Sequence, residues 1–300
     1  MTSSPSSDSL RRLPFTTDDT DAVVEFCAAH GDNQDARLLL ELTSDREGVI
    51  AIGDSDGMRL VTTVVDRIRN GADAALLETL GVRAPIAAAA FMRLVVEPAI
   101  AFARGGERRA LHVVLEEARL PAVGAEGALH DAGFSHVYDT FEMRRPGSVP
   151  VPEAPAPLPA GWSWAALDGV RVDAAHVALI EMFRDALATS VVPLAEFREA
   201  VVSGAAVWRV LLDGDRIAGL VRIAVHGAGG TLRILGRVPA YRGRGLGPRL
   251  VAEGLRVLRE AGAGDVDLSV EVSNEQALGL YRRFGFEVLT RTPVFALTLR

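Results

Sequence analysis

The run Val238-Pro-Ala-Tyr-Arg-Gly-Arg-Gly-Leu-Gly247 decides how the second half of this 300-residue chain folds. It follows an apolar stretch, residues 231–235, and precedes residues 248–261. In the latter, apolar side chains recur at helical spacing: Leu250, Val251, Leu255 and Leu258. Glycine tolerates the left-handed backbone of a sharp turn best, and the run contains three glycines in five positions. The sequence therefore predicts a strand, a glycine turn and an amphipathic helix.

A turn of this kind is suited to binding an anion. The first N–H groups of a helix have no acceptor within the helix, and the helix dipole adds partial positive charge there. Arg242 and Arg244 add full charges. The run lacks the Lys-Ser/Thr ending of a nucleoside-triphosphate loop and the third glycine of a dinucleotide loop. We therefore expect a phosphorylated ligand, most simply a nucleotide-like cofactor.

A second segment, residues 268–286, narrows the choice of cofactor. It reads as a strand followed by Asn274-x-x-Ala277, then Leu280-Tyr281, then Gly285-Phe286. Together with the spacing Arg-x-x-Gly-x-Gly, and Val-Pro four residues earlier, this order resembles the two recurrent motifs of the GNAT superfamily of N-acetyltransferases. The resemblance covers residues 160–300. It implies an acetyl-CoA-dependent N-acetyltransferase that moves an acetyl group to the primary amine of a small molecule by direct attack.

The two halves of the chain are similar to one another. Shifting the first half by 156 residues aligns its residues 82–106 with residues 238–262, and both halves contain a strand, an acidic turn and a strand upstream. We interpret this as a duplication, with chance similarity in an alanine-rich sequence as the alternative. The predicted fold is α/β: two tandem GNAT-like domains, each a mixed, mainly antiparallel sheet flanked by helices.

Six prolines between Arg145 and Gly161 predict an extended linker between the halves. The expected domains are a disordered tail (1–9), a degenerate GNAT-like domain (10–146), the linker (147–160) and a catalytic GNAT domain (161–300). In this organisation the chain resembles the mycothiol synthases, although Thr231 stands where we would place a glutamate of that group.

The first half has lost the residues of both motifs. At the position of the glycine turn it reads Ile86-Ala-Ala-Ala-Ala-Phe91, without arginine or glycine. Leu129 falls where the second half has Tyr281, and Leu115 falls where it has Glu271. We expect the first half to serve as a scaffold; a retained but altered ligand site is the alternative.

The resemblance implies a set of cofactor-binding positions. They are Arg237, Val238, Arg242, Gly243, Arg244, Gly245, Leu246, Gly247 and Asn274. Arg242 and the amides from Arg244 to Gly247 would anchor acetyl-CoA, and an amide near Arg237 or Val238 would stabilise the oxyanion. Asn274 would contact the pantetheine arm, while a helix N-cap is its simpler structural role.

Two catalytic residues are expected. Tyr281 matches the family tyrosine that protonates the departing thiolate, although a buried core aromatic would look the same in sequence. Glu271 is the first candidate for the general base, since it ends a strand beside the cofactor motif. His226, the helical pair Glu181 and Asp185, and ordered water are the alternatives.

The composition limits the possible partners and compartments. The net charge of −7 argues against nucleic acid, and no apolar run reaches the roughly 18 residues of a membrane helix. The single cysteine, Cys27, and the polar start fit a cytoplasmic protein. We expect a monomer or homodimer that acts on a small-molecule amine, without a metal. The alternatives are a non-catalytic CoA-binding sensor or interaction protein, and an acyltransferase that uses a longer acyl-CoA.

Overall fold

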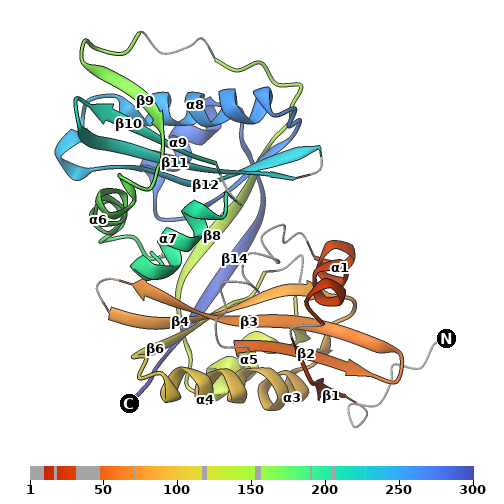
Figure 1. Ribbon diagram of the computed structural model, residues 1–300. Helices are drawn as coiled ribbons and strands as arrows, with labels where there is room; N and C mark the ends of the chain where they lie inside the picture. The colour runs from red at the N-terminus through yellow and green to blue at the C-terminus, as the bar shows by residue number, and fades with distance from the viewer. Residues whose placement is uncertain are drawn as a thin grey trace. The chain divides into compact units, whose positions relative to one another are not determined.

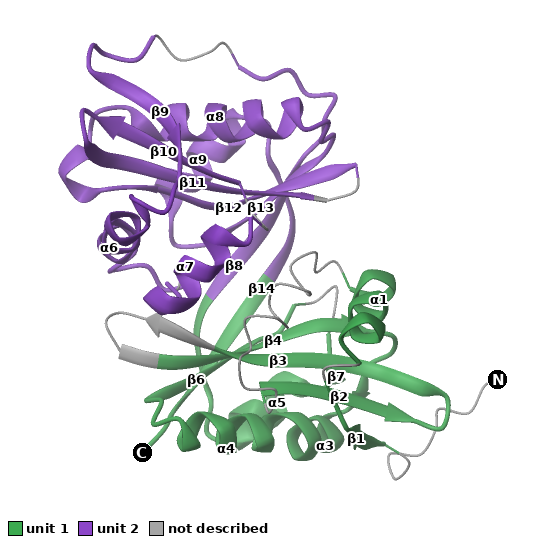
Figure 2. Cartoon of the chain, viewed as in Figure 1, with its two compact units in different colours: residues 1–68, 72–138, 292–300 green, residues 69–71, 139–291 purple. Residues whose placement is uncertain are grey.

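The computed structural model describes residues 10–16, 19–31, 48–69, 72–116, 120–152, 157–189, 191–204, 207–226 and 228–300. The predicted tail, residues 1–9, lies outside this part of the chain. Contacts between residues divide the chain into two compact units (Figure 2). Unit 1 contains residues 1–68, 72–138 and 292–300, and unit 2 contains residues 69–71 and 139–291.

Unit 2 is a mixed sheet between two pairs of helices. Its strands, in spatial order, are β8 (Ser135–Arg145), β13 (Val266–Glu271), β12 (Gly229–Arg237), β11 (Arg216–His226), β10 (Val207–Asp213) and β9 (Trp162–Ala166). Its helices are α6 (Val172–Met182), α7 (Leu194–Val202), the 3₁₀ turn η6 (Pro239–Tyr241), α8 (Leu246–Glu260) and α9 (Glu275–Arg283). Helices α6 and α7 cover one face, and α8 and α9 cover the other (Figure 1). Only the β12–β13 pair is parallel among these neighbours.

Unit 1 repeats this plan. Its strands, in spatial order, are β1 (Arg11–Leu13), β2 (Val49–Asp54), β3 (Gly57–Arg69), β4 (Ala72–Val82), β6 (Ala110–Val114) and β14 (Glu287–Thr298). Its helices are α1 (Thr20–His30), α3 (Ala88–Phe91), the π-helical turn η4 (Met92–Val96), α4 (Glu97–Gly105) and α5 (Ala125–Asp131), and the short strands β5 (Ile86–Ala87) and β7 (Ala122–Val123) pair separately. Strands β4 and β6 are parallel, as β12 and β13 are in unit 2. This repetition supports the predicted duplication.

The units divide the chain differently from the predicted domains 10–146 and 161–300. Residues 140–145 of β8 pair with all six residues of β13 and so belong to the sheet of unit 2. Residues 294–298 of β14 pair with β6 and so belong to the sheet of unit 1. Each sheet therefore takes one strand from the other half of the sequence, and a cut in the linker would leave β13 without its antiparallel neighbour.

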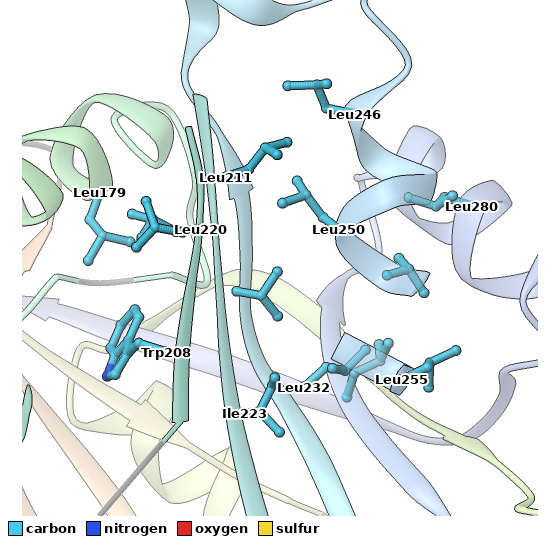
Figure 3. Close-up of a cluster of buried hydrophobic side chains, with 14 of the residues drawn as sticks. Leu179, Trp208, Leu211, Leu220, Ile223, Leu232, Leu246, Leu250, Leu255 and Leu280 are labelled. Atoms are coloured by element: carbon cyan, nitrogen blue, oxygen red, sulfur yellow. The ribbon is translucent and has the colours of Figure 1, made fainter. Parts of the chain in front are cut away.

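The core of unit 2 explains why α8 forms where the sequence predicts it. Leu250, Val251, Leu255 and Leu258 are all buried against the sheet. In Figure 3, Leu246 and Leu250 of α8 lie on one side of the strands, and Leu179 of α6 lies on the other. Each such side chain contributes about 1.5–3 kcal/mol when it is removed from water. This packing fixes the helix whose first turn follows the glycine run.

Two predicted elements have different bounds. The residue pattern over 172–189 predicts one helix, but α6 ends at Met182 and the following residues make contacts outside any helix. The residue pattern predicts two short strands, at 286–289 and 294–299, but the structure has one strand there, β14. Pro293 does not interrupt it, because Leu115 N–H donates to the Pro293 carbonyl and the missing proline N–H is not needed for that bond.

Candidate functional site

The two sequence motifs meet at one edge of the sheet of unit 2. Strands β12 and β13 are parallel, so their carboxyl ends, Arg237 and Glu271, lie at the same edge, where α8 and α9 begin. The two strands pair only at Gly230–Val266 and Thr231–Asp267. Beyond these pairs, β12 continues without hydrogen-bonded pairing to β13. On its other side, the pairing register between β12 and β11 shifts between Arg222 and Ile223. The edge is therefore built from two diverging strand ends.

The glycine run forms a turn with two left-handed residues. Gly243 has φ +78° and Gly245 has φ +67°, and Gly245 is the N-cap of α8. A Cβ at either position would meet no atom within 4 Å, so backbone conformation rather than crowding requires glycine there. Gly247 differs, because its Cβ would come 3.0 Å from Leu280 Cδ2. That close approach packs α9 against the first turn of α8.

The amides of this turn are available to a ligand. No side chain caps the start of α8, and its first turn contains no acidic residue. Within the described ranges, the N–H groups of Gly243, Arg244 and Gly245 have no acceptor. Arg242 and Arg244 are exposed, and the Arg242 guanidinium makes no ion pair with a described residue. Open amides, two cations and a helix N-terminus together favour the binding of an anion.

Tyr241 supports this turn, a role that the sequence analysis missed. Its hydroxyl donates to Asp213 Oδ2 at 3.3 Å, and Trp162 packs edge-on against its ring at 5.6 Å. Arg244 Cζ lies 5.0 Å from the ring centroid. Burial, together with the Asp213 carboxylate, raises the pKa of Tyr241. A tyrosine directly before Arg242 and three residues before Arg244 was the available signal, because its ring can orient one of these arginines.

The structure distinguishes the two predicted oxyanion donors. The Val238 N–H donates to the Ala218 carbonyl at 3.0 Å. Because amides alternate in direction along an antiparallel strand, the neighbouring Arg237 N–H points away from β11, toward the side where β13 has diverged. Arg237 remains the candidate, whereas the Val238 amide already has an acceptor. The Arg237 side chain donates to Gln276 Oε1 at 3.2 Å, which links the end of β12 to α9.

Asn274 is the N-cap of α9. Its side-chain oxygen accepts from the Ala277 N–H at 3.1 Å. The structural role named in the sequence analysis is therefore present. The amide nitrogen of the same side chain has no partner among the described residues, so it stays available for the predicted contact with a cofactor.

Tyr281 lies on α9, one residue after the leucine that contacts Gly247. It is 8% exposed and packs against Phe286 with ring centroids 5.9 Å apart. Its hydroxyl makes no hydrogen bond with a described residue. Burial raises its pKa to about 12. Both readings from the sequence thus have support, since the ring is part of the core and the hydroxyl is an unused donor.

Glu271 accepts hydrogen bonds from the loop that follows α6, although the residue pattern there predicts a longer helix. The N–H groups of Leu187 and Ala188 both donate to its Oε1 at 2.6 Å, and the Ser273 hydroxyl lies 3.4 Å from Oε2. The other candidate bases are less defined. Glu181 and Asp185 do not share a helical face, because α6 ends at Met182. The side chain of His226 lies outside the described part of the chain.

The corresponding region of unit 1 has a different local structure. Ile86 N–H donates to the Pro121 carbonyl at 2.9 Å, and β5 pairs with β7. Ala87, the N-cap of α3, has an ordinary extended backbone with φ −68°. Leu129 and Leu115 are fully buried core residues. Alanines in ordinary backbone conformations therefore stand where unit 2 has left-handed glycines, and the tyrosine and glutamate positions are filled by apolar packing.

Other features of the described residues lie away from this edge. A cavity of about 230 Å³ is lined by Arg145, Arg259 and Val266, and none of the predicted site residues lines it. Arg145 is buried and donates to the Phe284 carbonyl at the end of α9, so it serves as a helix C-terminal cap. The described ranges hold no group of three or more potential metal ligands. None of their helices is both long and apolar enough for a membrane span.

Comparison with known proteins agrees with this geometry. Residues 172–286 match the model of the acetyltransferase (GNAT) family. A mycothiol acetyltransferase from Clavibacter sepedonicus is 45% identical over 75 residues, which are 25% of each chain. The chain thus spans about a quarter of the length of this curated relative.

Two solved structures match nearly the whole chain. A GCN5-related N-acetyltransferase from Sphaerobacter thermophilus has a TM-score of 0.68 at 18% identity, covering 98% of this chain and 96% of that one. A tandem GNAT protein from the clavulanic acid biosynthesis pathway has a TM-score of 0.65 at 15% identity, covering 96% and 98%. The whole chain therefore has the fold of tandem GNAT proteins.

Proposed function

Because residues 172–286 form an acetyltransferase domain of the GNAT family, we propose that this protein transfers an acetyl group from acetyl-CoA to a primary amine of a small molecule. The observation that carries the proposal is the open turn at the start of α8. Its amides have no acceptor within the described ranges, its two left-handed glycines keep side chains out of the space beside it, and Arg242 and Arg244 are exposed there.

The residues present fit acetyl-CoA. The turn suits a diphosphate, because several N–H donors and a helix dipole converge on it. Where β12 and β13 diverge, unpaired backbone groups suit an amide-containing arm, and the side-chain nitrogen of Asn274 is an additional donor. When bound, acetyl-CoA supplies an activated acyl group whose carbonyl carbon is open to attack by an amine.

The protein's contribution is binding, orientation and charge stabilisation. The Arg237 N–H, which points away from β11, is the proposed donor to the oxyanion that develops when the amine nitrogen bonds to the carbonyl carbon. Bound acetyl-CoA would supply the leaving thiolate as its carbon–sulfur bond breaks, and the proton of the amine would go to solvent. The neutral form of the amine is the one that attacks.

Tyr281 is the proposed donor to the departing sulfur. Its pKa of about 12 keeps the phenol protonated at every physiological pH. A thiol has a reference pKa of roughly 8.5, so the buried phenol is the weaker acid of the two. We therefore assign it a hydrogen bond that stabilises the thiolate, and the net proton comes from solvent.

The test combines binding with turnover. Calorimetry should detect acetyl-CoA binding, and a free-thiol reagent should detect CoA release with one of a panel of amines: spermidine, kanamycin, glucosamine, lysine and a short peptide with a free N-terminus. Arg242→Ala combined with Gly245→Val should weaken binding by roughly a hundred-fold or more, because a charge and the left-handed turn are lost together. Thermal unfolding should show that the variant is still folded.

Unchanged binding in that folded variant would refute the proposal. Binding without transfer to any amine would instead favour a CoA-binding sensor. Faster turnover with longer acyl-CoA substrates would favour an acyltransferase that uses a longer acyl-CoA.

A further inference from the structure

The residues that follow α6 cross the site edge between the two diverging strands. We call residues 182–188 the bridging segment. On the β12 side, an ideal Cβ at Gly236 would lie 2.9 Å from both Met182 Sδ and Phe183 Cζ, so these side chains rest directly on the backbone of β12. On the β13 side, the N–H groups of Leu187 and Ala188 donate to Glu271 Oε1 at 2.6 Å each. The bridging segment is therefore held at both strand ends.

Its position matters because the strands are no longer paired there. Their ladder ends at Thr231 and Asp267, and both Gly236 and Glu271 lie beyond that point. The same edge carries the Arg237 N–H and, on α9, Tyr281. A molecule that approaches the reacting carbonyl from this side meets the bridging segment.

Glu271 is poorly arranged for a general base. A base must accept a proton on an oxygen that faces the substrate. Oε1 already accepts two amide protons, and Oε2 lies 3.4 Å from the Ser273 hydroxyl. Hydrogen bonds from two N–H groups to one carboxylate are charge-assisted and strong, which suits a clamp.

We propose that Glu271 is a positioning residue: it acts through the amides of Leu187 and Ala188 to hold the bridging segment as the wall against which the acceptor amine binds. The proposal rests on the proposed function for its consequence in catalysis. The clamp itself is a property of the protein alone and can be measured without any substrate.

The first experiment measures hydrogen exchange of the Leu187 and Ala188 amides in three full-length proteins. Glu271→Gln keeps an oxygen acceptor and should leave exchange within about three-fold of the parent. Glu271→Ala removes the acceptor and should speed exchange at both amides by about ten-fold or more. Ser273→Ala, which changes only the contact with Oε2, is the matched control and should leave both amides protected.

The second experiment separates positioning from base catalysis by steady-state kinetics with the most active amine of the panel. Glu271→Ala should raise the KM for that amine by about ten-fold and leave the KM for acetyl-CoA unchanged. Glu271→Gln should have a KM for the amine close to that of the parent and should keep the pH–rate profile of the parent. Loss of a general base would instead lower kcat about a hundred-fold in both variants.

Each outcome is decisive. Unchanged exchange at Leu187 and Ala188 in Glu271→Ala overturns the clamp, even if no amine is acetylated. Equal losses of kcat in Glu271→Gln and Glu271→Ala, with a lost limb in the pH profile, overturn the positioning role in favour of a base. A parent protein that binds no acetyl-CoA while the clamp behaves as expected refutes the proposed function and leaves the clamp standing.

Discussion

The turn before α8 in unit 2 and the segment before α3 in unit 1 occupy corresponding places in a duplicated plan, yet their backbone conformations and their charges differ. In unit 2, Gly243 and Gly245 take left-handed conformations and leave amides without an acceptor. In unit 1, alanines in ordinary conformations follow Ile86, whose amide is bonded to Pro121. The same fold thus contains a turn of left-handed glycines with two arginines in unit 2 and a segment of alanines without either in unit 1.

The difference extends to the residues around each turn. Tyr281 of unit 2 has an unused hydroxyl, whereas Leu129 of unit 1 is fully buried. Glu271 accepts two loop amides, whereas Leu115 contributes to a core. Polar groups that lack partners are costly to bury, so a unit without a ligand gains stability when apolar residues replace them. This contrast supports the proposal that unit 2 keeps such groups for a ligand.

The largest effect expected from a single substitution is on Tyr281. Tyr281→Phe should lower kcat by about a hundred-fold and leave the acetyl-CoA dissociation constant unchanged, because only the hydroxyl is lost. The counterpart Leu129→Met in unit 1 should leave kcat unchanged. Stopped-flow or steady-state CoA release measures both, and a Tyr281→Phe variant with parental kcat would remove the tyrosine from the mechanism.

The raised pKa of Tyr281 also gives a pH dependence of stability. The unfolded tyrosine ionises near pH 10, but the folded one ionises only near pH 12, so the folded state keeps its proton longer. The stabilisation from Tyr281 is complete below about pH 10 and is lost as the pH rises toward 12. In denaturant titrations the parent should therefore lose stability relative to Tyr281→Phe as the pH rises from about 10 toward 12; a constant difference over this range would contradict the assignment.

A smaller effect is expected at Asn274, where two roles can be separated. Asn274→Ala should cost about 1 kcal/mol of stability, because the N-cap of α9 is lost. Asn274→Asp keeps an acceptor for the Ala277 N–H and should retain that stability. If the amide nitrogen also contacts the cofactor, both variants should weaken acetyl-CoA binding. Calorimetry and thermal unfolding on the same samples separate the two roles. Normal acetyl-CoA binding in both variants would show that Asn274 serves only as the N-cap of α9.

The sequence predicted those parts of the structure that depend on local patterns. The glycine turn, the stripe of leucines on α8 and the capped start of α9 follow from spacing and residue type alone. The antiparallel pairs β2–β3, which turns after Asp54, and β10–β11, which turns after Asp213, follow from acidic turns between apolar runs. Tandem GNAT architecture was predicted from the motifs together with the internal repeat, and the structural matches confirm it.

Other features depend on partners that are distant in sequence. The pairing of β8 with β13 is decided by sheet edges rather than by either strand's own pattern. The end of α6 at Met182 coincides with contacts to Gly236, and Glu271 binds the amides beyond it; no periodicity in residues 172–189 reveals either contact. The support from Tyr241 likewise depends on Asp213 and Trp162, both remote in the chain.

The most direct test of the account is a titration of ¹⁵N-labelled protein with acetyl-CoA, followed at the backbone amides of both turns. We predict large shifts and slowed exchange at residues 243–247, with residues 86–91 unchanged. Shifts confined to residues 86–91, or no change at 243–247 under saturating acetyl-CoA, would contradict the claim that the open turn of unit 2 binds the cofactor.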